Sequence, residues 1–490
     1  MSLVKKLAGE TVIYGLGHIL PRILHFTIFN TYLTYRVSRG EYAIYLDLYA
    51  YASILIVLFS YRMDTALFRF GKDRDKVEET YSTSLFPMFL SSMLLVVVGF
   101  AFSDTLANLL TYPGRGYYVK LFSCIIAFDV VALIPYARYR LLSKPKMFVG
   151  FKIANILITV LLVLIFLEWN PRQLVETYFP FIRGDIDLVF IANLIASAIV
   201  CVSLVVINVP KKVSVNLGLW RKMVRYAWPL IIVGLAASVN QFFAVPLQKY
   251  FLGAEIELNK DQSAIYGAAQ KIASLLAMFT TAYNYAAEPF FFRHSDKSKS
   301  KQLYGEIALL FVIAGGLLSL VIFLYMDVFQ IIVGPNFRSA LYLVPVLLMS
   351  YLFLGLYYNV SIWYKLSDNT GYGAIIALIG AGITLTGSVA MLPVFGIDAS
   401  AWTALICYGI MVVLAYVIGQ IKYPIDYPIK RITTQLFLIG ALLYVGYLIK
   451  SDYVLRNLLS GTAILFCYIG AACVLEGKNI LNQIQFSFKK

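Results

Sequence analysis

The chain has 490 residues, of which 60% are hydrophobic and only 14% are charged, and its mean hydropathy is +0.77. This apolar content exceeds what a soluble core of that length can bury, so the composition excludes a soluble globular protein. The 41 Lys and Arg residues outnumber the 26 Asp and Glu residues, and in a membrane protein such an excess is typical of cytoplasmic loops rather than of a nucleic-acid surface.

Fourteen stretches are long and apolar enough to cross a bilayer as helices, which takes about 20 residues each. We therefore expect an all-α polytopic membrane protein. The loops are too short to hold an extramembrane catalytic or binding domain, so the function is expected to reside in the helices. In chain order the predicted spans are 8–33, 41–65, 80–103, 117–140, 147–168, 187–209, 223–251, 262–290, 303–326, 340–364, 371–393, 398–419, 431–450 and 453–475.

Basic residues are distributed unequally between the loops. Those that follow the second, fourth, sixth and eighth spans carry clusters of Lys and Arg, such as Arg138, Arg140, Lys144 and Lys146. The intervening loops are acidic or nearly neutral, so the positive-inside rule places both termini in the cytoplasm. The five cysteines lie in apolar stretches without a Cys/His cluster, and neither a metal site nor a cofactor is expected.

An internal repeat is visible at an offset of 221 residues. Ala43-Ile44-Tyr45 matches Ala264-Ile265-Tyr266, and Ala52-Ser53 matches Ala273-Ser274. The offset predicts two pseudo-symmetric six-helix lobes followed by two additional helices, a plan typical of transporters that rock one lobe against the other. Chance similarity between apolar helices is the alternative. The predicted division is residues 1–210, 211–425 and 426–490.

The first span carries a cluster of cationic and imidazole side chains. His18, Arg22 and His25 are spaced so that they share one helix face. A charged side chain at mid-bilayer costs roughly 2.5 to 3.5 kcal/mol on insertion scales, so this face is expected to line the bundle interior or a wet cavity. The alternative is structural, because Pro21 frees a backbone carbonyl that these side chains would cap.

Three of the further cations within predicted spans are candidate site residues. Lys271 is deep in its span and is expected either to line a cavity or to hold helices together. Arg62 and Lys249 lie within about a turn of their span ends, where a long side chain either lines the cavity or reaches the interface.

Two acids lie deep inside predicted spans, Asp47 in the second and Asp129 in the fourth. Each is interpreted as a counter-ion or as a carrier of a coupling proton or sodium ion, with a structural salt bridge as the alternative. Cations and imidazoles outnumber acids at the deep positions. This excess of positive charge suits an anionic substrate. Phosphate or diphosphate is the candidate, because Arg and Lys donate charge-assisted hydrogen bonds to its oxygens.

Three motifs near the N-terminus carry a resemblance to a known family. The stretch from Lys6 to Tyr14, the segment Gly40 to Tyr45 and the segment Met63 to Phe70 resemble the opening of bacterial polysaccharide flippases. These are the O-antigen and capsule type within the multidrug/oligosaccharidyl-lipid/polysaccharide exporter superfamily, and they are similar to lipid II flippase. The resemblance covers the whole chain in its fourteen spans, but only about the first 70 residues in motif.

The resemblance implies a function. Such proteins move undecaprenyl-diphosphate-linked oligosaccharides across the bacterial inner membrane for polysaccharide biosynthesis, alongside glycan polymerases and glycosyltransferases. By position, Arg22 and Arg62 correspond to the cations thought to hold the diphosphate, with Asp47 as their acidic partner, while Lys271 matches only loosely. No covalent chemistry is required, so an enzyme is not expected.

Two other functions are considered. A multidrug exporter of the same superfamily would exchange cationic drugs for protons or sodium through acidic and aromatic cavity residues, and deep acids are few here. A membrane glycosyltransferase or O-antigen polymerase would be expected to have a long outer loop with catalytic residues, and no loop in this chain is long enough.

Overall fold

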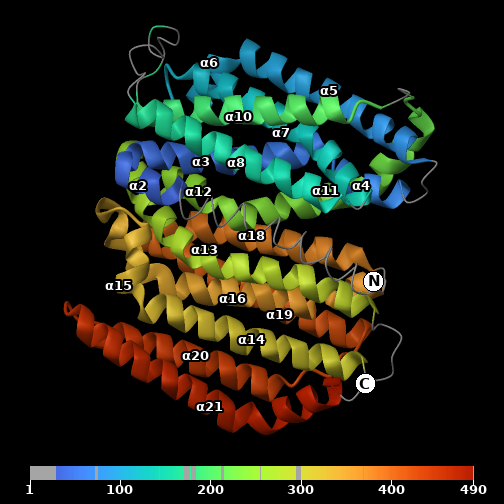
Figure 1. The fold of residues 1–490 in the computed structure, drawn as a ribbon. Helices are drawn as coiled ribbons and strands as arrows, with labels where there is room; N and C mark the ends of the chain where they lie inside the picture. The colour runs from blue at the N-terminus through green and yellow to red at the C-terminus, as the bar shows by residue number, and fades with distance from the viewer. Residues whose placement is uncertain are drawn as a thin grey trace. The chain divides into compact units, whose positions relative to one another are not determined.

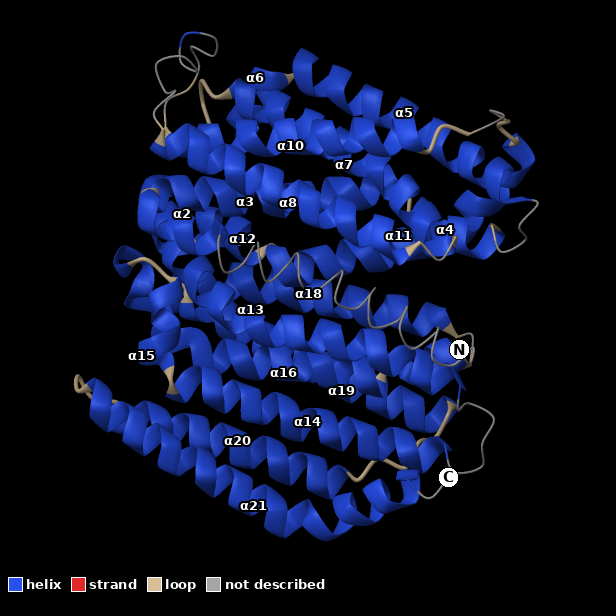
Figure 2. Cartoon of the chain, viewed as in Figure 1, coloured by secondary structure: helices blue, strands red, loops and turns tan. Residues whose placement is uncertain are grey.

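The protein is described here by a computed structural model. Helices account for nearly all of the described chain, which contains no β-strand (Figure 2), and the all-α prediction is confirmed. The structure describes residues 29–71, 76–142, 144–169, 177, 182, 184–210, 214–253, 255–293, 300–367 and 369–488.

Twelve helices or helix pairs among these residues are long and apolar enough to cross a membrane. Two predicted spans are missing from that set, for different reasons. Most of the span 8–33 lies outside the described residues, and the span 262–290 lies within α13 (Ile256–Arg293), where Gln262, Gln270 and Lys271 lower the hydropathy. The remaining twelve predictions each coincide with one of these membrane-length helices.

The chain forms two compact units, Met1–Pro246 and Leu247–Lys490. In unit 1, α7 packs against α5 and α10, and α3 packs against α7 and α11 (Figure 1). The predicted lobe boundaries after residues 210 and 425 stay predictions. The helices of unit 1 are α2 (Thr31–Arg36), α3 (Arg39–Ser60), α4 (Met63–Phe70), α5 (Val77–Ala101), α6 (Ser103–Leu109), α7 (Gly116–Leu141), α8 (Pro145–Glu168), α10 (Asp185–Ile207) and α11 (Leu217–Phe242); α12 (Ala244–Phe251) crosses the boundary.

Local sequence explains several helix ends in unit 1. The Ser38 side chain accepts a hydrogen bond from the Glu41 backbone N–H, and the Glu41 carboxylate accepts one from the Ser38 backbone N–H. This capping box satisfies two amides that the first turn of α3 leaves without partners. Pro145 begins α8 at a position where a missing N–H costs nothing.

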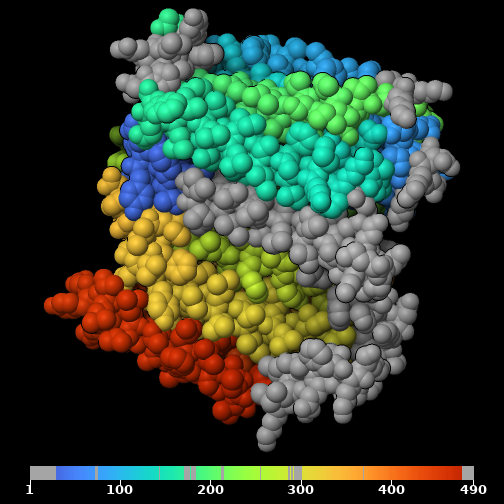
Figure 3. Space-filling view, in the orientation of Figure 1, coloured from blue at the N-terminus to red at the C-terminus, as the bar shows by residue number. Residues whose placement is uncertain are grey.

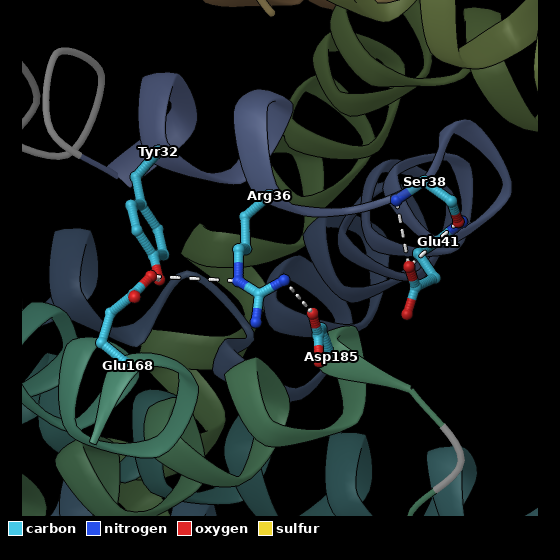
Figure 4. A network of polar contacts seen from close by, with 6 residues as sticks. All are labelled: Tyr32, Arg36, Ser38, Glu41, Glu168 and Asp185. Carbon is cyan, nitrogen blue, oxygen red and sulfur yellow. Dashed lines mark hydrogen bonds and ion pairs between the residues drawn. The ribbon is translucent and has the colours of Figure 1, made fainter. Parts of the chain in front are cut away.

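A network of polar side chains joins α2 to two other elements of unit 1 (Figure 4). The Arg36 guanidinium lies 3.2 Å from an Asp185 carboxylate oxygen at the start of α10. It also lies 3.9 Å from Glu168 at the end of α8, and the Tyr32 hydroxyl donates to the same Glu168 carboxylate. The network ties α2 to the ends of α8 and α10.

Unit 2 is built around α16, which packs against α13, α14 and α19, while α18 packs against α19 (Figure 1). Helices α20 and α21 pack against α14 and against each other. Besides α13, unit 2 contains α14 (Ser300–Leu324), α15 (Met326–Phe329), η3 (Gln330–Ile332), η4 (Pro335–Leu343), α16 (Val344–Val360), α17 (Ile362–Leu366), α18 (Thr370–Phe395), α19 (Asp398–Lys422), α20 (Ile429–Ile449) and α21 (Val454–Phe488).

Arg431 on α20 joins three helices of unit 2. Its Nη1 donates to Glu306 of α14 at 2.7 Å, and its Nε donates to Glu476 of α21 at 2.8 Å. The Glu476 side chain is only 1% exposed. The predicted two-helix addition is therefore tied to α14 through the ion pair between Arg431 and Glu306.

Many large apolar side chains are exposed on α20 and α21, the helices drawn in red in Figure 3. Phe437 is 80% exposed and Val474 is 86% exposed. A water-soluble protein rarely presents such a surface, whereas hydrocarbon is a suitable solvent for it. These faces therefore suit contact with lipid.

Candidate functional site

The second predicted span contains a break that the sequence did not predict. Helix α3 ends at Ser60 and α4 begins at Met63. Tyr61 and Arg62 between them both adopt the left-handed conformation, with φ of 48° and 54°. This conformation costs an L-residue other than glycine roughly 1 to 2 kcal/mol, and such outliers cluster at functional sites.

Contacts on both sides hold the break in place. The Arg62 backbone N–H donates to the Ser60 hydroxyl at 3.4 Å. The Tyr61 ring packs edge-on against Trp220 of α11, with 6.1 Å between ring centres. In the sequence repeat Arg62 matches Tyr283, but α13 runs unbroken through that position, so the break belongs to unit 1 alone.

Arg62 itself is half-buried at the start of α4. The helix continues to Phe70, so Arg62 is farther from the end of its span than the predicted boundary at 65 implied. Its guanidinium lies against Gly234 of α11. Within the described part of the chain, no carboxylate pairs with this guanidinium. Among the described residues, this cation beside the helix break therefore has no counter-ion.

Asp47 is buried on α3, with an exposed fraction of 1%. The Tyr112 hydroxyl, from the turn between α6 and α7, donates to its Oδ2 at 2.7 Å. Burial and the neighbouring carboxylate raise the pKa of the Tyr112 phenol well above its usual value, so the phenol remains a proton donor. Asp47 therefore has a fixed partner in its own unit, and its predicted role as counter-ion or coupling residue stays a prediction.

Asp129 belongs to a second polar network inside unit 1. The Ser197 hydroxyl of α10 donates to Asp129 of α7 at 3.0 Å. Asn193, one turn before Ser197, donates to the Tyr49 hydroxyl of α3. Lys152 of α8 is close enough to interact electrostatically with Asp129. The network provides one carboxylate and several neutral oxygens from three helices, α3, α7 and α10, a set compatible with holding a proton or a small cation.

The two predicted cations of unit 2 have different surroundings. Lys249 on α12 is buried, with an exposed fraction of 1%. Its ammonium lies 4.6 Å from the centre of the Tyr250 ring. Lys271 on α13 is half-buried, and among the described residues its ammonium has no ion-pair or hydrogen-bond partner. Their roles in substrate binding stay predictions.

The remaining predicted site residues, His18, Arg22 and His25, lie outside the described residues. Sequence reasoning also missed Tyr112, Ser197 and Gly234, which contact or adjoin the predicted residues. Gly234 alone gave a usable signal, since a glycine inside a helix costs about 1 kcal/mol relative to alanine and usually marks a close approach.

The comparisons with known proteins assign the chain to a family. A family model described as "Polysaccharide biosynthesis protein" matches residues 7–295, more than half of the chain. The chain belongs to this polysaccharide biosynthesis protein family. The resemblance to polysaccharide flippases is thereby confirmed at the level of the family. A search of curated proteins found no significant match.

Solved structures of flippases and transporters share the fold of this polysaccharide biosynthesis protein. Lipid II flippase MurJ in an inward closed conformation has a TM-score of 0.71 at 15% identity, covering 96% of this chain and 100% of that chain. A MATE in complex with MaD3S has a TM-score of 0.59 at 11% identity, covering 87% and 95%. The Vibrio cholerae MATE transporter VcmN in the bent form has a TM-score of 0.57 at 12% identity, covering 89% and 98%. At these identities the similarity establishes the fold alone.

Proposed function

We propose that this polysaccharide biosynthesis protein is a flippase that moves an undecaprenyl-diphosphate-linked oligosaccharide across the bacterial inner membrane. Its membership of the family supports a role in glycan synthesis. The observation that carries the proposal is the Arg62 guanidinium, which has no counter-ion among the described residues although it lies within a membrane-length helical segment. An anionic substrate would supply that counter-ion.

The chemistry of Arg62 suits a diphosphate. A charged side chain inside a membrane segment costs a few kcal/mol and in transporters marks a substrate or ion pathway. A guanidinium presents five donors in a rigid fork that matches phosphate oxygens in a bidentate arrangement. Lys271, which also lacks an ion-pair or hydrogen-bond partner for its ammonium among the described residues, is proposed as a further contact.

Transport in this proposal needs no covalent step. The diphosphate and sugar head bind to the cations while the polyprenyl tail stays in lipid, and alternating access re-exposes the head on the other side of the membrane. Both termini are proposed to face the cytoplasm, where glycosyltransferases build the lipid-linked glycan.

The test is deletion of the gene in the source bacterium followed by complementation with variants. Loss of the protein is expected to remove the surface glycan, and Arg62→Ala is expected to restore it poorly. Arg69→Ala is the matched control, because Arg69 lies on the same helix but is exposed and rests on the Tyr226 ring at 4.3 Å. An unchanged surface glycan in the deletion strain refutes the proposal, and full complementation by Arg62→Ala refutes the site.

The second candidate is a cation-coupled multidrug exporter. The observation in its favour is the set of MATE transporters with the same fold, together with the Asp129 network. It predicts that the deletion strain becomes sensitive to cationic drugs while its surface glycan stays normal, and that Asp129→Asn reproduces this sensitivity.

A further inference from the structure

A glycine on α11 determines how much room the Arg62 guanidinium has. A Cβ added at Gly234 would lie 2.7 Å from Arg62 Nη2, 2.9 Å from Arg62 Nε and 2.9 Å from Val57 Cγ1. All three distances are shorter than real Cβ contacts, so any residue larger than glycine at position 234 forces its neighbours to move.

The two neighbours differ in how easily they move. Val57 is β-branched and buried within α3, and a β-branched side chain in a helix has one strongly preferred rotamer. The guanidinium of Arg62 is the far end of a flexible side chain. Alanine at position 234 would therefore displace the guanidinium, and its close contact with Val57 would in addition lower folding stability.

Helix α11 is fixed against α3 on both sides of Gly234. Before it along the chain, Trp220 packs against the Tyr61 ring. After it, the Ser238 hydroxyl donates to the Ser53 carbonyl at 3.4 Å. These contacts prevent α11 from simply moving away from a larger residue at 234, and the left-handed backbone at Arg62 fixes the origin of its side chain.

We infer that Gly234 is a positioning residue for Arg62. Because glycine has no side chain, the guanidinium can lie against α11, in the place where the diphosphate of the substrate binds. This inference rests on the proposed function. It assigns a specificity role to an apolar position that neither charge nor motif singles out.

The experiment measures binding of farnesyl diphosphate to the full-length protein in detergent, with farnesol as the uncharged control ligand. Four proteins form a cycle: the natural protein, Arg62→Ala, Gly234→Ala and the double variant. Arg62→Ala is expected to raise the Kd for farnesyl diphosphate about tenfold or more, since a hydrogen bond to a charged group is lost. Gly234→Ala is expected to raise it about tenfold in the natural protein and less than about twofold in the Arg62→Ala background.

Two further glycine variants control for packing. Gly99→Ala also creates a crowded contact in unit 1, 2.7 Å from Ser123 Cβ, and is expected to lower the unfolding temperature without changing the Kd. Gly150→Ala meets no atom within 4 Å and is expected to change neither.

The outcomes separate the two ideas. If Arg62→Ala leaves the Kd unchanged, the diphosphate role of Arg62 fails. If Arg62→Ala weakens binding but Gly234→Ala does not, only the positioning role of Gly234 is overturned. Equal losses from Gly234→Ala in both backgrounds would show a merely structural role and would also overturn the inference.

Discussion

Replacing Arg431 by alanine should destabilise unit 2 strongly. The substitution removes the partner of Glu476, whose side chain is 1% exposed, and of Glu306, whose side chain is 14% exposed. Removing one member of a buried ion pair typically costs 3 to 5 kcal/mol, because the other charge stays buried without compensation. Arg431 is itself 27% exposed, so we expect the lower end of that range, about 3 kcal/mol.

The assay is thermal unfolding of the protein in detergent. A loss of about 3 kcal/mol corresponds to a fall in Tm of roughly 6 to 12 °C for a unit of this size. Arg456→Ala is the control, since Arg456 is exposed on α21, and it should leave Tm unchanged. The double variant Arg431→Ala/Glu476→Gln should recover part of the loss, because it neutralises the buried carboxylate. A Tm for Arg431→Ala equal to that of the Arg456 control would refute the reasoning.

Three more predictions concern unit 1. Tyr112→Phe should lower the free energy of unfolding by about 1 to 3 kcal/mol, since the buried Asp47 carboxylate loses a hydrogen-bond donor. Tyr453→Phe, at an exposed position, should leave it unchanged, and equal Tm values for the two variants would contradict the prediction. Arg36→Ala should lower the free energy of unfolding by less than about 1 kcal/mol, because the ion pairs of Arg36 are partly exposed. This loss should be smaller in high salt, which unfolding measurements with and without added salt will test. Asp129→Asn should leave folding intact while removing the dependence of transport on a pH or sodium gradient, measured in reconstituted vesicles; unchanged gradient dependence would exclude Asp129 as the coupling residue.

The membrane spans could be predicted from sequence because lipid selects for long apolar stretches, and no tertiary knowledge is needed to recognise them. The break at Tyr61 and Arg62 could not. Neither residue is glycine or proline, and the break depends on contacts with Ser60 and with Trp220, which lies far along the chain. Arg62 consequently lies deeper in its helical segment than the predicted boundary placed it.

The acidic residues inside the spans likewise could be predicted from the sequence, but their partners could not. Asp47 and Asp129 were identified from their position inside apolar spans, since a lone acid there is costly wherever it faces. Their partners Tyr112 and Ser197 were not, because each lies more than 60 residues away. The first pairing depends on how the turn between α6 and α7 lies against α3, and the second depends on how α7 and α10 pack. Charge is a local property of the sequence, whereas pairing is a property of the fold.

The interruption between α3 and α4 has a consequence for the energy of translocation. Where two helices meet end to end, the last carbonyls of one and the first amides of the other lack intrahelical partners, and at membrane depth such backbone is tolerated only within protein or beside water. Tyr61 and Arg62 are both partly exposed, so water is expected to satisfy these groups. Under the proposed function, a diphosphate arriving at Arg62 would then keep much of its hydration shell. The largest cost of carrying an anion through hydrocarbon, its dehydration, would be largely avoided.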